Sequence, residues 1–151
     1  MITFEDFVAA RGAALQRLAR GLLPPADAEA AVQDVLARAS LRWGRLGRAG
    51  DPTPLVQRML VEAGTSWRWR VRRAAPSPGA DGGVLARLRS LPAPQRAVLA
   101  LRYLGDDLGD LDDERVADVL DRTPAAVRRD AGRGLAALHR EPATGAPSRT
   151  A

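Results

Sequence analysis

Apolar residues recur every three or four positions along most of this chain, and no stretch alternates between apolar and polar residues as a β-strand would. In the first half this period marks one face of a helix at Phe4–Leu22, which a pair of prolines ends. We expect a second helix after Asp27 and a third after Asp51, because aspartate is a favourable N-cap. The Gly- and Arg-rich segment around Trp43 is expected to be a loop. The pattern therefore predicts an all-α protein.

The second half has the pattern of four shorter helices, expected at Val84–Leu91, Pro94–Leu104, Asp112–Leu120 and Pro124–Leu138. Thr123 and Pro124 are a strong start signal for the last helix, because threonine caps a helix and proline fits the first turn. A short turn at Asp121-Arg122 separates the last two helices. Together they have the length pattern of a helix-turn-helix, a DNA-binding motif.

A helical wheel gives the last of these helices two different sides. One side is apolar and is expected to pack on the rest of the protein. The other side carries small and basic residues: Ala125, Ala126, Arg129, Arg133 and Arg140. Small residues let a backbone approach a DNA groove, and arginine binds phosphate or pairs with guanine. An ordinary surface helix is the alternative. Asp130 favours it, because it would place a carboxylate near the phosphates, although the wheel places this residue on the flank of the helix.

A segment rich in Pro, Gly and Ala interrupts the helical pattern at residues 76–83 and has the composition of a linker. A similar segment at residues 142–151 is expected to be a disordered tail. We therefore predict two small helical bundles, residues 1–75 and residues 84–141, joined by a Pro/Gly-rich linker. The second bundle contains the helix-turn-helix.

The net charge of +5 is carried by arginine, because all 23 basic residues are Arg. In the second half the charges separate: Asp106 to Asp121 is acidic, whereas Arg122 to Arg140 is mostly basic. A basic first half and a basic last helix favour a polyanionic partner. Ordinary solvated helix faces are the alternative interpretation.

Residue types that enzymes and metal sites need are scarce. The chain has no cysteine and one histidine, His139, at the end of the arginine-rich helix. The acids between Asp106 and Glu114 lack the alternation and the central glycine of an EF-hand. We find neither a phosphate-binding glycine loop nor a nucleophile motif. The sequence predicts a protein that is not an enzyme, with no catalytic residue, metal, cofactor or small-molecule substrate.

No run of apolar residues approaches the roughly 18 that a membrane span needs. The start of the chain is acidic and lacks the basic head and apolar stretch of a signal peptide. We therefore expect no membrane partner and a cytoplasmic location.

The third helix combines tryptophan with arginine. The wheel places Trp67 on its inner side and Arg58, Arg68, Trp69 and Arg72 on its outer side. An exposed indole among guanidinium groups suits stacking on unpaired bases beside a bound phosphate backbone. Two alternatives remain: Trp69 caps the bundle, or it stacks on Arg72.

Motifs in five parts of the chain, in order and with matching spacing, resemble one known family. They are Phe4–Phe7–Val8–Arg11 with Leu15-Gln16-Arg17-Leu18-Ala19; Asp27-Ala28-Glu29 with Val32-Gln33-Asp34-Val35-Leu36; Asp51-Pro52, Leu60-Val61 and Ser66-Trp67-Arg68-Trp69-Arg70; Leu91-Pro92-Ala93-Pro94-Gln95-Arg96-Ala97-Val98-Leu99 with Leu101-Arg102-Tyr103; and the helix-turn-helix. Together they span residues 3–140 and resemble a bacterial RNA polymerase sigma factor of the sigma-70 family, extracytoplasmic-function type. The likeness is to the short actinobacterial SigE-like group.

The resemblance implies a protein without catalytic chemistry that brings RNA polymerase to promoters and helps to open the duplex. It implies contacts with the clamp helices of the polymerase core at Glu29, Gln33 and Asp34. It implies contacts with the −10 element at Arg58, Arg68, Trp69 and Arg72. It implies −35 contacts on the DNA backbone at Thr123 and Arg128, and on bases or phosphates at Arg129 and Arg133. An anti-sigma factor is a further candidate partner.

The chain departs from the family pattern at several positions. Ala30 and Ala31 stand where an acidic and a large apolar residue are usual, Glu62 replaces an asparagine, and Asp121 and Asp130 replace a turn glycine and an arginine. These departures motivate a second hypothesis, a sigma-like module that binds polymerase or a regulator without initiating transcription. A third hypothesis is a stand-alone helix-turn-helix regulator of DNA.

Overall fold

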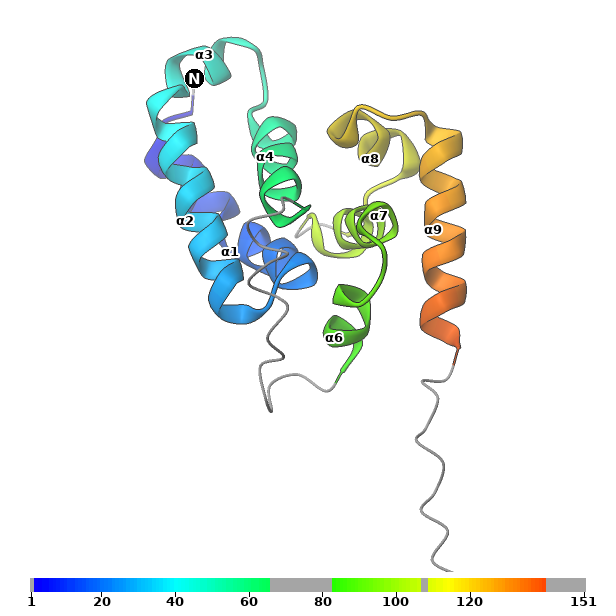
Figure 1. The fold of residues 1–151 in the computed structure, drawn as a ribbon. Helices are drawn as coiled ribbons and strands as arrows, with labels where there is room; N and C mark the ends of the chain where they lie inside the picture. Colours follow the sequence, from blue (N-terminus) through cyan, green and yellow to red (C-terminus); the bar gives the residue numbers. More distant parts are fainter. Residues whose placement is uncertain (1, 66–82, 107–108, 141–151) are drawn as a thin grey trace, which may run out of the picture.

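The computed structural model describes residues 2–65, 83–106 and 109–140, and within these ranges the chain forms helices without strands (Figure 1). The helices are α1 (Phe4–Leu22), α2 (Pro25–Leu41), α3 (Trp43–Arg48), α4 (Thr53–Thr65), α6 (Val84–Arg89), α7 (Ala93–Leu104), α8 (Asp113–Leu120) and α9 (Pro124–His139). The predicted all-α fold is confirmed. Among the described helices, none combines the length and the apolar composition of a membrane span.

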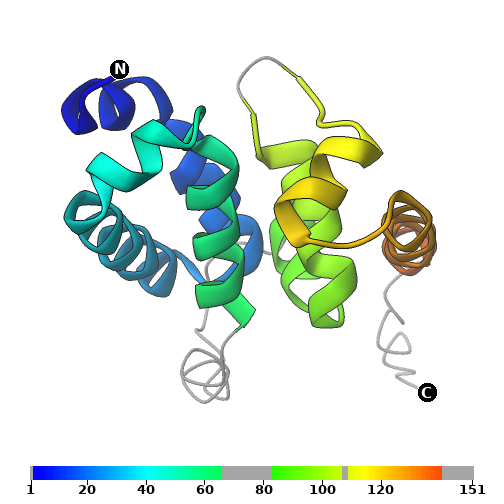
Figure 2. The same cartoon turned by 90° about the horizontal axis from the view of Figure 1, so that it is seen from above.

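Helices α1, α2 and α4 pack against one another as a first group (Figure 2). Side chains three and four positions apart lie on one side of a helix, so the apolar period of the sequence becomes a buried face on each of them. The fully buried side chains of this group include Phe7, Leu18, Leu22, Val32, Val35, Val56 and Leu60. The inner faces that the period predicts are those that form the core.

The starts of α2 and α4 illustrate two kinds of helix N-terminus. α2 begins at Pro25, with Pro24 as its N-cap, so the prediction that Asp27 caps this helix is wrong. Proline fits the first turn because its missing N–H has no partner there, and the Asp27 carboxylate in the same turn is stabilised by the helix dipole. At α4 the prediction is confirmed, because an Asp51 side-chain oxygen accepts a hydrogen bond from the Thr53 N–H at 3.0 Å.

The expected loop around Trp43 is a short helix, α3, and this is a second correction. The Trp43 indole N–H donates a hydrogen bond to the Ile2 carbonyl oxygen at 3.0 Å. Its ring lies edge-on to Phe4 and tilted against Phe7, with ring centroids 5.3 and 5.0 Å apart. Glycine lowers helix propensity by about 1 kcal/mol per residue. Contacts of Trp43 with the start of α1 compensate for that loss.

Helices α6, α8 and α9 pack around α7 as a second group. Asp112 is the N-cap of α8, and its side chain accepts a hydrogen bond from the Arg115 N–H at 2.8 Å. Asp121 follows the last residue of α8 and has the left-handed conformation, with φ 53°. α9 begins with Thr123, whose hydroxyl oxygen accepts from the Ala126 N–H at 3.2 Å. These starts and this turn agree with the sequence prediction.

Four guanidinium groups donate hydrogen bonds to carbonyl oxygens at the C-terminal ends of helices other than their own. Arg89 bonds the end of α1, Arg96 the end of α6, Arg58 the end of α8 and Arg87 the end of α9. The last carbonyls of a helix lack partners within it and carry partial negative charge, so a cation stabilises this end. Two of these contacts, those of Arg89 and Arg58, join the two groups of helices.

The two groups also meet through an apolar contact between α1 and α7 (Figure 2). Gly21 is buried there, and a Cβ atom added to it would lie 2.6 Å from Leu104 Cδ1 and 3.3 Å from the Ala100 Cβ. The backbone of α1 therefore lies directly against the second group. Residues 76–82 of the expected linker and the expected tail at 142–151 lie outside the described residues, so the domain boundaries stay a prediction.

Candidate nucleic-acid interface

The outer side of α9 is a continuous strip of small and basic residues. All of its members are exposed: Ala125, Arg128, Arg129, Gly132, Arg133 and Ala136. The inner side is buried at Val127 and Ala131. At Gly134 the helix lies so close to α7 that an added Cβ would be 2.6 Å from Leu99 Cδ1. The two sides expected from the helical wheel are therefore present. We call the strip the outer face of α9.

Asp130 is the only acidic residue of α9, and it lies inside rather than on the flank where the wheel placed it. Its side chain is 8% exposed, and one carboxylate oxygen accepts a hydrogen bond from Arg122 Nη1 at 2.5 Å. Arg122 belongs to the turn before α9 and folds back over the helix to neutralise the carboxylate. The expectation that Asp130 would stand near the phosphates of bound DNA is therefore wrong, and the outer face of α9 carries no acid.

Arg128 lies at the edge of the outer face of α9, and Thr123 lies just before the start of the helix. The Arg128 guanidinium is 59% exposed and lies 3.9 Å from a carboxylate oxygen of Asp113, which also pairs with Arg102 of α7. Asp113 thus links the ends of three helices and restricts the position of Arg128. The Thr123 hydroxyl oxygen accepts a bond from the helix, which leaves its O–H available as a donor to an outside group.

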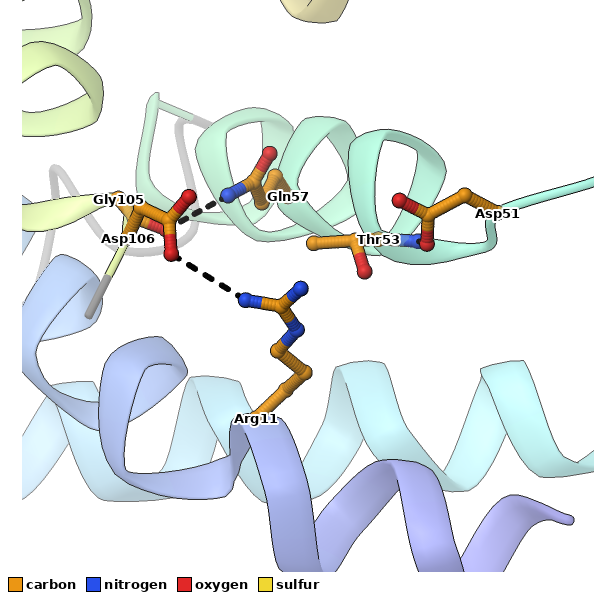
Figure 3. A network of polar contacts seen from close by, with 6 residues as sticks. All are labelled: Arg11, Asp51, Thr53, Gln57, Gly105 and Asp106. Carbon is orange, nitrogen blue, oxygen red and sulfur yellow. Dashed lines mark hydrogen bonds and ion pairs between the residues drawn. The ribbon is translucent and has the colours of Figure 1, made fainter. Parts of the chain in front are cut away.

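Arg58 does not face solvent as the wheel of the third helix predicted. Its Nε donates to the Val119 carbonyl oxygen at 2.7 Å, and its Nη2 donates to that of Asp118 at 3.2 Å. Its neighbour Gln57 is buried and donates to the Gly105 carbonyl oxygen at 2.8 Å (Figure 3). This side of α4 is therefore covered by α8 and by the end of α7. The other residues of the predicted −10 surface, Arg68, Trp69 and Arg72, and the predicted core residue Trp67, lie outside the described residues.

The predicted polymerase contacts lie together on the outer side of α2. Glu29, Gln33 and Asp34 are all exposed. Asp34 forms an ion pair with Arg38, one turn along, at 2.8 Å. Leu41 lies on the same side, two turns after Gln33, and is 86% exposed, which makes it the most exposed large apolar residue that the structure describes.

The acidic segment before α8 has partners within the protein. In the ranges that the structure describes, no group of three or more acidic or histidine side chains is placed to hold a metal ion. Asp106 pairs with Arg11 of α1 at 3.2 Å, and Asp112 caps α8. These carboxylates therefore hold helices in place.

The sequence and the fold are both similar to those of known proteins. No protein family model matches the sequence. The chain is 29% and 28% identical to the RNA polymerase sigma-E factors of Streptomyces coelicolor and Streptomyces avermitilis, each match covering 93% of this chain and 86% of the relative. That of Streptomyces antibioticus is 29% identical over 93% of this chain and 85% of its own length. The chain is therefore similar to RNA polymerase sigma factors over nearly its whole length.

The fold of the chain is similar to that of CnrH, which was solved in complex with the cytosolic domain of CnrY. The TM-score is 0.68 at 23% sequence identity, and the match covers 89% of this chain and 84% of CnrH. This likeness shows the fold, and the names of the three relatives support a sigma factor role.

Two residues that orient α9, Arg122 and Asp113, were not singled out from the sequence. Both lie in the helix-turn-helix, but the motif assigns them no role, because each acts on a partner in a different element. The one available signal was the position of Asp130 between Val127 and Ala131, which are both buried. A carboxylate at such a position needs a cationic partner, and the nearest arginine in the preceding turn is Arg122.

Proposed function

We propose that this protein is a sigma factor that directs the RNA polymerase core to promoters, with α9 recognising the −35 duplex and the segment that begins with α4 engaging the −10 element. The observation that supports this most directly is the outer face of α9. It combines exposed arginines with small side chains on a helix whose opposite side is fixed against α7. Such a helix fits the major groove, because small residues allow close approach.

Within the outer face of α9, the proposed roles follow from position. Arg129 and Arg133 are one turn apart, so both side chains reach the same groove, where arginine pairs with guanine or binds phosphate. Thr123 and Arg128 lie near the N-terminus of the helix, where the dipole and the free N–H groups favour a phosphate. These two residues would position the helix on the DNA backbone, whereas Arg129 and Arg133 would read sequence.

The outer side of α2 is the proposed contact with the clamp helices of the polymerase. Glu29, Gln33 and Asp34 supply polar and acidic groups there, and Leu41 adds exposed apolar area. Buried apolar side chains with a polar rim are typical of protein interfaces. Ala30 is exposed beside these residues, whereas Ala31 is part of the core, so the departure from the family at position 31 affects packing rather than the contact surface.

The proposal for the −10 element includes Arg58, Arg68, Trp69 and Arg72. Single-stranded DNA binds where aromatic side chains stack on bases and cations bind the backbone. The proposed division into residues 1–75 and 84–141 would let the two DNA contacts be made by separate units. An anti-sigma protein that covers either unit is the proposed regulator.

Transcription with purified core polymerase tests this function. Full-length protein, core enzyme and a pool of genomic promoter fragments are combined, and the transcripts are sequenced. We expect transcripts that start at defined promoters only when the protein is present. Binding to core without transcripts would favour the interaction module, and duplex binding that polymerase does not improve would favour a stand-alone regulator.

A matched pair of variants links the activity to α9. Arg129→Ala with Arg133→Ala should abolish promoter-dependent transcripts and leave binding to core unchanged. Arg45→Ala with Arg48→Ala on α3 makes the same change in net charge away from the proposed surfaces and should leave both unchanged. Equal transcription by the two double variants would contradict the proposal for α9.

A further inference from the structure

Asp113 connects α8 with arginines of two helices that pack against it, α7 and α9 (Figure 1). One carboxylate oxygen, Oδ1, pairs with Arg102 Nη2 of α7, and the other, Oδ2, lies 3.9 Å from Arg128 Nη1 of α9. Asp113 is the first residue of α8, where the helix dipole stabilises a negative charge. The proposed function gives Arg128 a phosphate contact but leaves Asp113 without a role in binding.

The two ion pairs of Asp113 differ in exposure and in distance. The side chains of Arg102 and Asp113 are 20% and 21% exposed, so water and salt screen their attraction only weakly. The Arg128 side chain is mostly exposed, and exposed ion pairs contribute little binding energy. Arg102 therefore fixes the carboxylate with its second oxygen facing Arg128, while Arg128 stays free to move towards an outside group.

Arg128 differs in this respect from the other arginines of the outer face of α9. In the part of the chain that the structure describes, no acidic side chain pairs with Arg129 or Arg133, whereas Arg128 has Asp113. An arginine side chain samples many rotamers, and binding a phosphate costs it that freedom. A side chain that is already held near its bound position loses less, so it binds more tightly. Arg128 starts from such a restricted position.

We infer that Asp113 is a positioning residue for DNA binding: held by Arg102, its carboxylate orients the Arg128 guanidinium towards a phosphate of the bound duplex. This inference rests on the function proposed above. Asp113 does not touch the DNA in this arrangement and acts only through Arg128. It therefore strengthens binding although its own charge has the same sign as that of the DNA.

The charge of Asp113 does not cancel the attraction of this site for a phosphate. The cluster contains two guanidinium groups and one carboxylate, so it remains positive as a whole. Arginine also presents several N–H donors in a planar fork, and in Arg128 it is Nη1 that faces Asp113. The donors on its other edge are therefore available to a phosphate while the carboxylate stays in place.

Removal of the Asp113 charge distinguishes positioning from electrostatic repulsion, because the two predict opposite signs. By repulsion alone, Asp113→Asn should strengthen binding to a duplex, since it takes a negative charge away from the neighbourhood of the phosphates. With positioning, we expect the affinity for a duplex selected by the wild-type protein to fall about fivefold. Glu114→Gln is the matched control, because it removes the same charge at the next, exposed residue of α8. It should leave the affinity equal to that of the wild type or slightly higher.

A double-mutant cycle with Arg128 tests whether the effect passes through this side chain. Arg128→Ala alone should weaken binding to the selected duplex. Asp113→Asn added to Arg128→Ala should cause no further loss, because the residue that Asp113 positions is already gone. Gel-shift titrations of the full-length proteins at one fixed salt concentration measure the four affinities.

Asp113 also joins α8 to α7 through Arg102, so folding is measured for every variant by circular dichroism and urea unfolding. Asp113→Glu keeps the carboxylate and should retain most of the wild-type affinity for the selected duplex. Asp113→Ser repeats the charge removal with a second short polar side chain and should behave as Asp113→Asn does. A purely structural role of Asp113 would lower the affinity by the same factor with and without Arg128.

The outcomes separate this inference from the proposed function. If Arg128→Ala weakens binding but Asp113→Asn binds as tightly as Glu114→Gln, positioning by Asp113 is overturned and the phosphate contact of Arg128 stands. Equal losses from Asp113→Asn in the presence and absence of Arg128 would also overturn it, because the effect would not pass through Arg128. If Arg128→Ala binds the selected duplex as the wild type does, Arg128 does not contact DNA, and both the inference and the proposed role of Arg128 are overturned.

Discussion

Arg122 and Asp130 form an ion pair across the start of α9, with 2.5 Å between the guanidinium Nη1 and a carboxylate oxygen. The carboxylate is buried, whereas the guanidinium keeps about a third of its surface exposed, at 31%. Because Arg122 is in the turn between α8 and α9, this pair joins that turn to the first half of α9. It also removes a negative charge from the helix proposed to bind DNA.

Removal of the Asp130 carboxylate is expected to destabilise the protein. Asp130→Ala should lower the free energy of unfolding by about 1–3 kcal/mol, between the values for exposed and for buried ion pairs, because Arg122 can reach water when it loses its partner. Asp130→Asn keeps an oxygen that accepts the hydrogen bond from Arg122 and should lower the free energy of unfolding by less. Urea unfolding measures both, with Asp110→Ala at an exposed position as the control. Equal stability of Asp130→Ala and Asp110→Ala would show that the pair does not hold the turn.

Arginines of the outer face of α9 should differ in the way they bind DNA. With a duplex selected by the wild-type protein from a random pool, Arg129→Ala or Arg133→Ala should weaken binding by about 1–3 kcal/mol and relax specificity at one position. Arg128→Ala should weaken binding to all sequences. It should also reduce the slope of the logarithm of the binding constant against the logarithm of the salt concentration by about one. Gel-shift titrations at several fixed salt concentrations measure these effects. Unchanged binding by all three variants would exclude this face from DNA recognition.

Thr123 has a structural role that can be separated from its proposed phosphate contact. Thr123→Ala removes the side chain that caps α9 and should lower the free energy of unfolding by about 1 kcal/mol. Thr123→Ser keeps the hydroxyl and should retain both stability and duplex affinity. Thermal unfolding and gel shifts on the same three proteins give the comparison. A serine variant as unstable as the alanine variant would mean that the methyl group, and not the cap, is important.

Substitution of two glycines of α9 by alanine should change the stability of the protein in opposite directions. Gly132 faces open space, so Gly132→Ala should stabilise the protein by up to about 1 kcal/mol through helix propensity. Gly134 lies against Leu99, and Gly134→Ala should destabilise it by about 1–3 kcal/mol because the added methyl group overpacks the contact with α7. Urea unfolding of the two variants distinguishes these outcomes. A stabilised Gly134→Ala protein would show that α9 does not lie so close to α7.

Helix starts were predictable where capping chemistry is local. The hydroxyl of Thr123 and the carboxylate of Asp51 accept hydrogen bonds from N–H groups two or three residues along, as their sequence neighbours indicate. Asp112, predicted as the first residue of its helix, is the N-cap of α8 instead. The helix at Trp43 was not predictable, because its stability comes from aromatic contacts with the other end of the first group. At α2, both Asp27 and the two prolines before it are suitable residues for a helix start, and the sequence pattern does not show which of them the helix uses. In the structure the helix begins at Pro25.

The amino-acid sequence alone determined that the chain is helical, which side of most helices is apolar, and where α8 and α9 begin, because these properties depend on residues within a few positions. It did not determine what each arginine does. Arg129 and Arg133 lie exposed on α9, whereas Arg58 and Arg87 bond the carbonyls of helices about fifty or more residues away in the chain. Only the tertiary structure decided this, because all these side chains are chemically identical and the energy of each guanidinium depends on the carbonyl, carboxylate or water that folding places beside it.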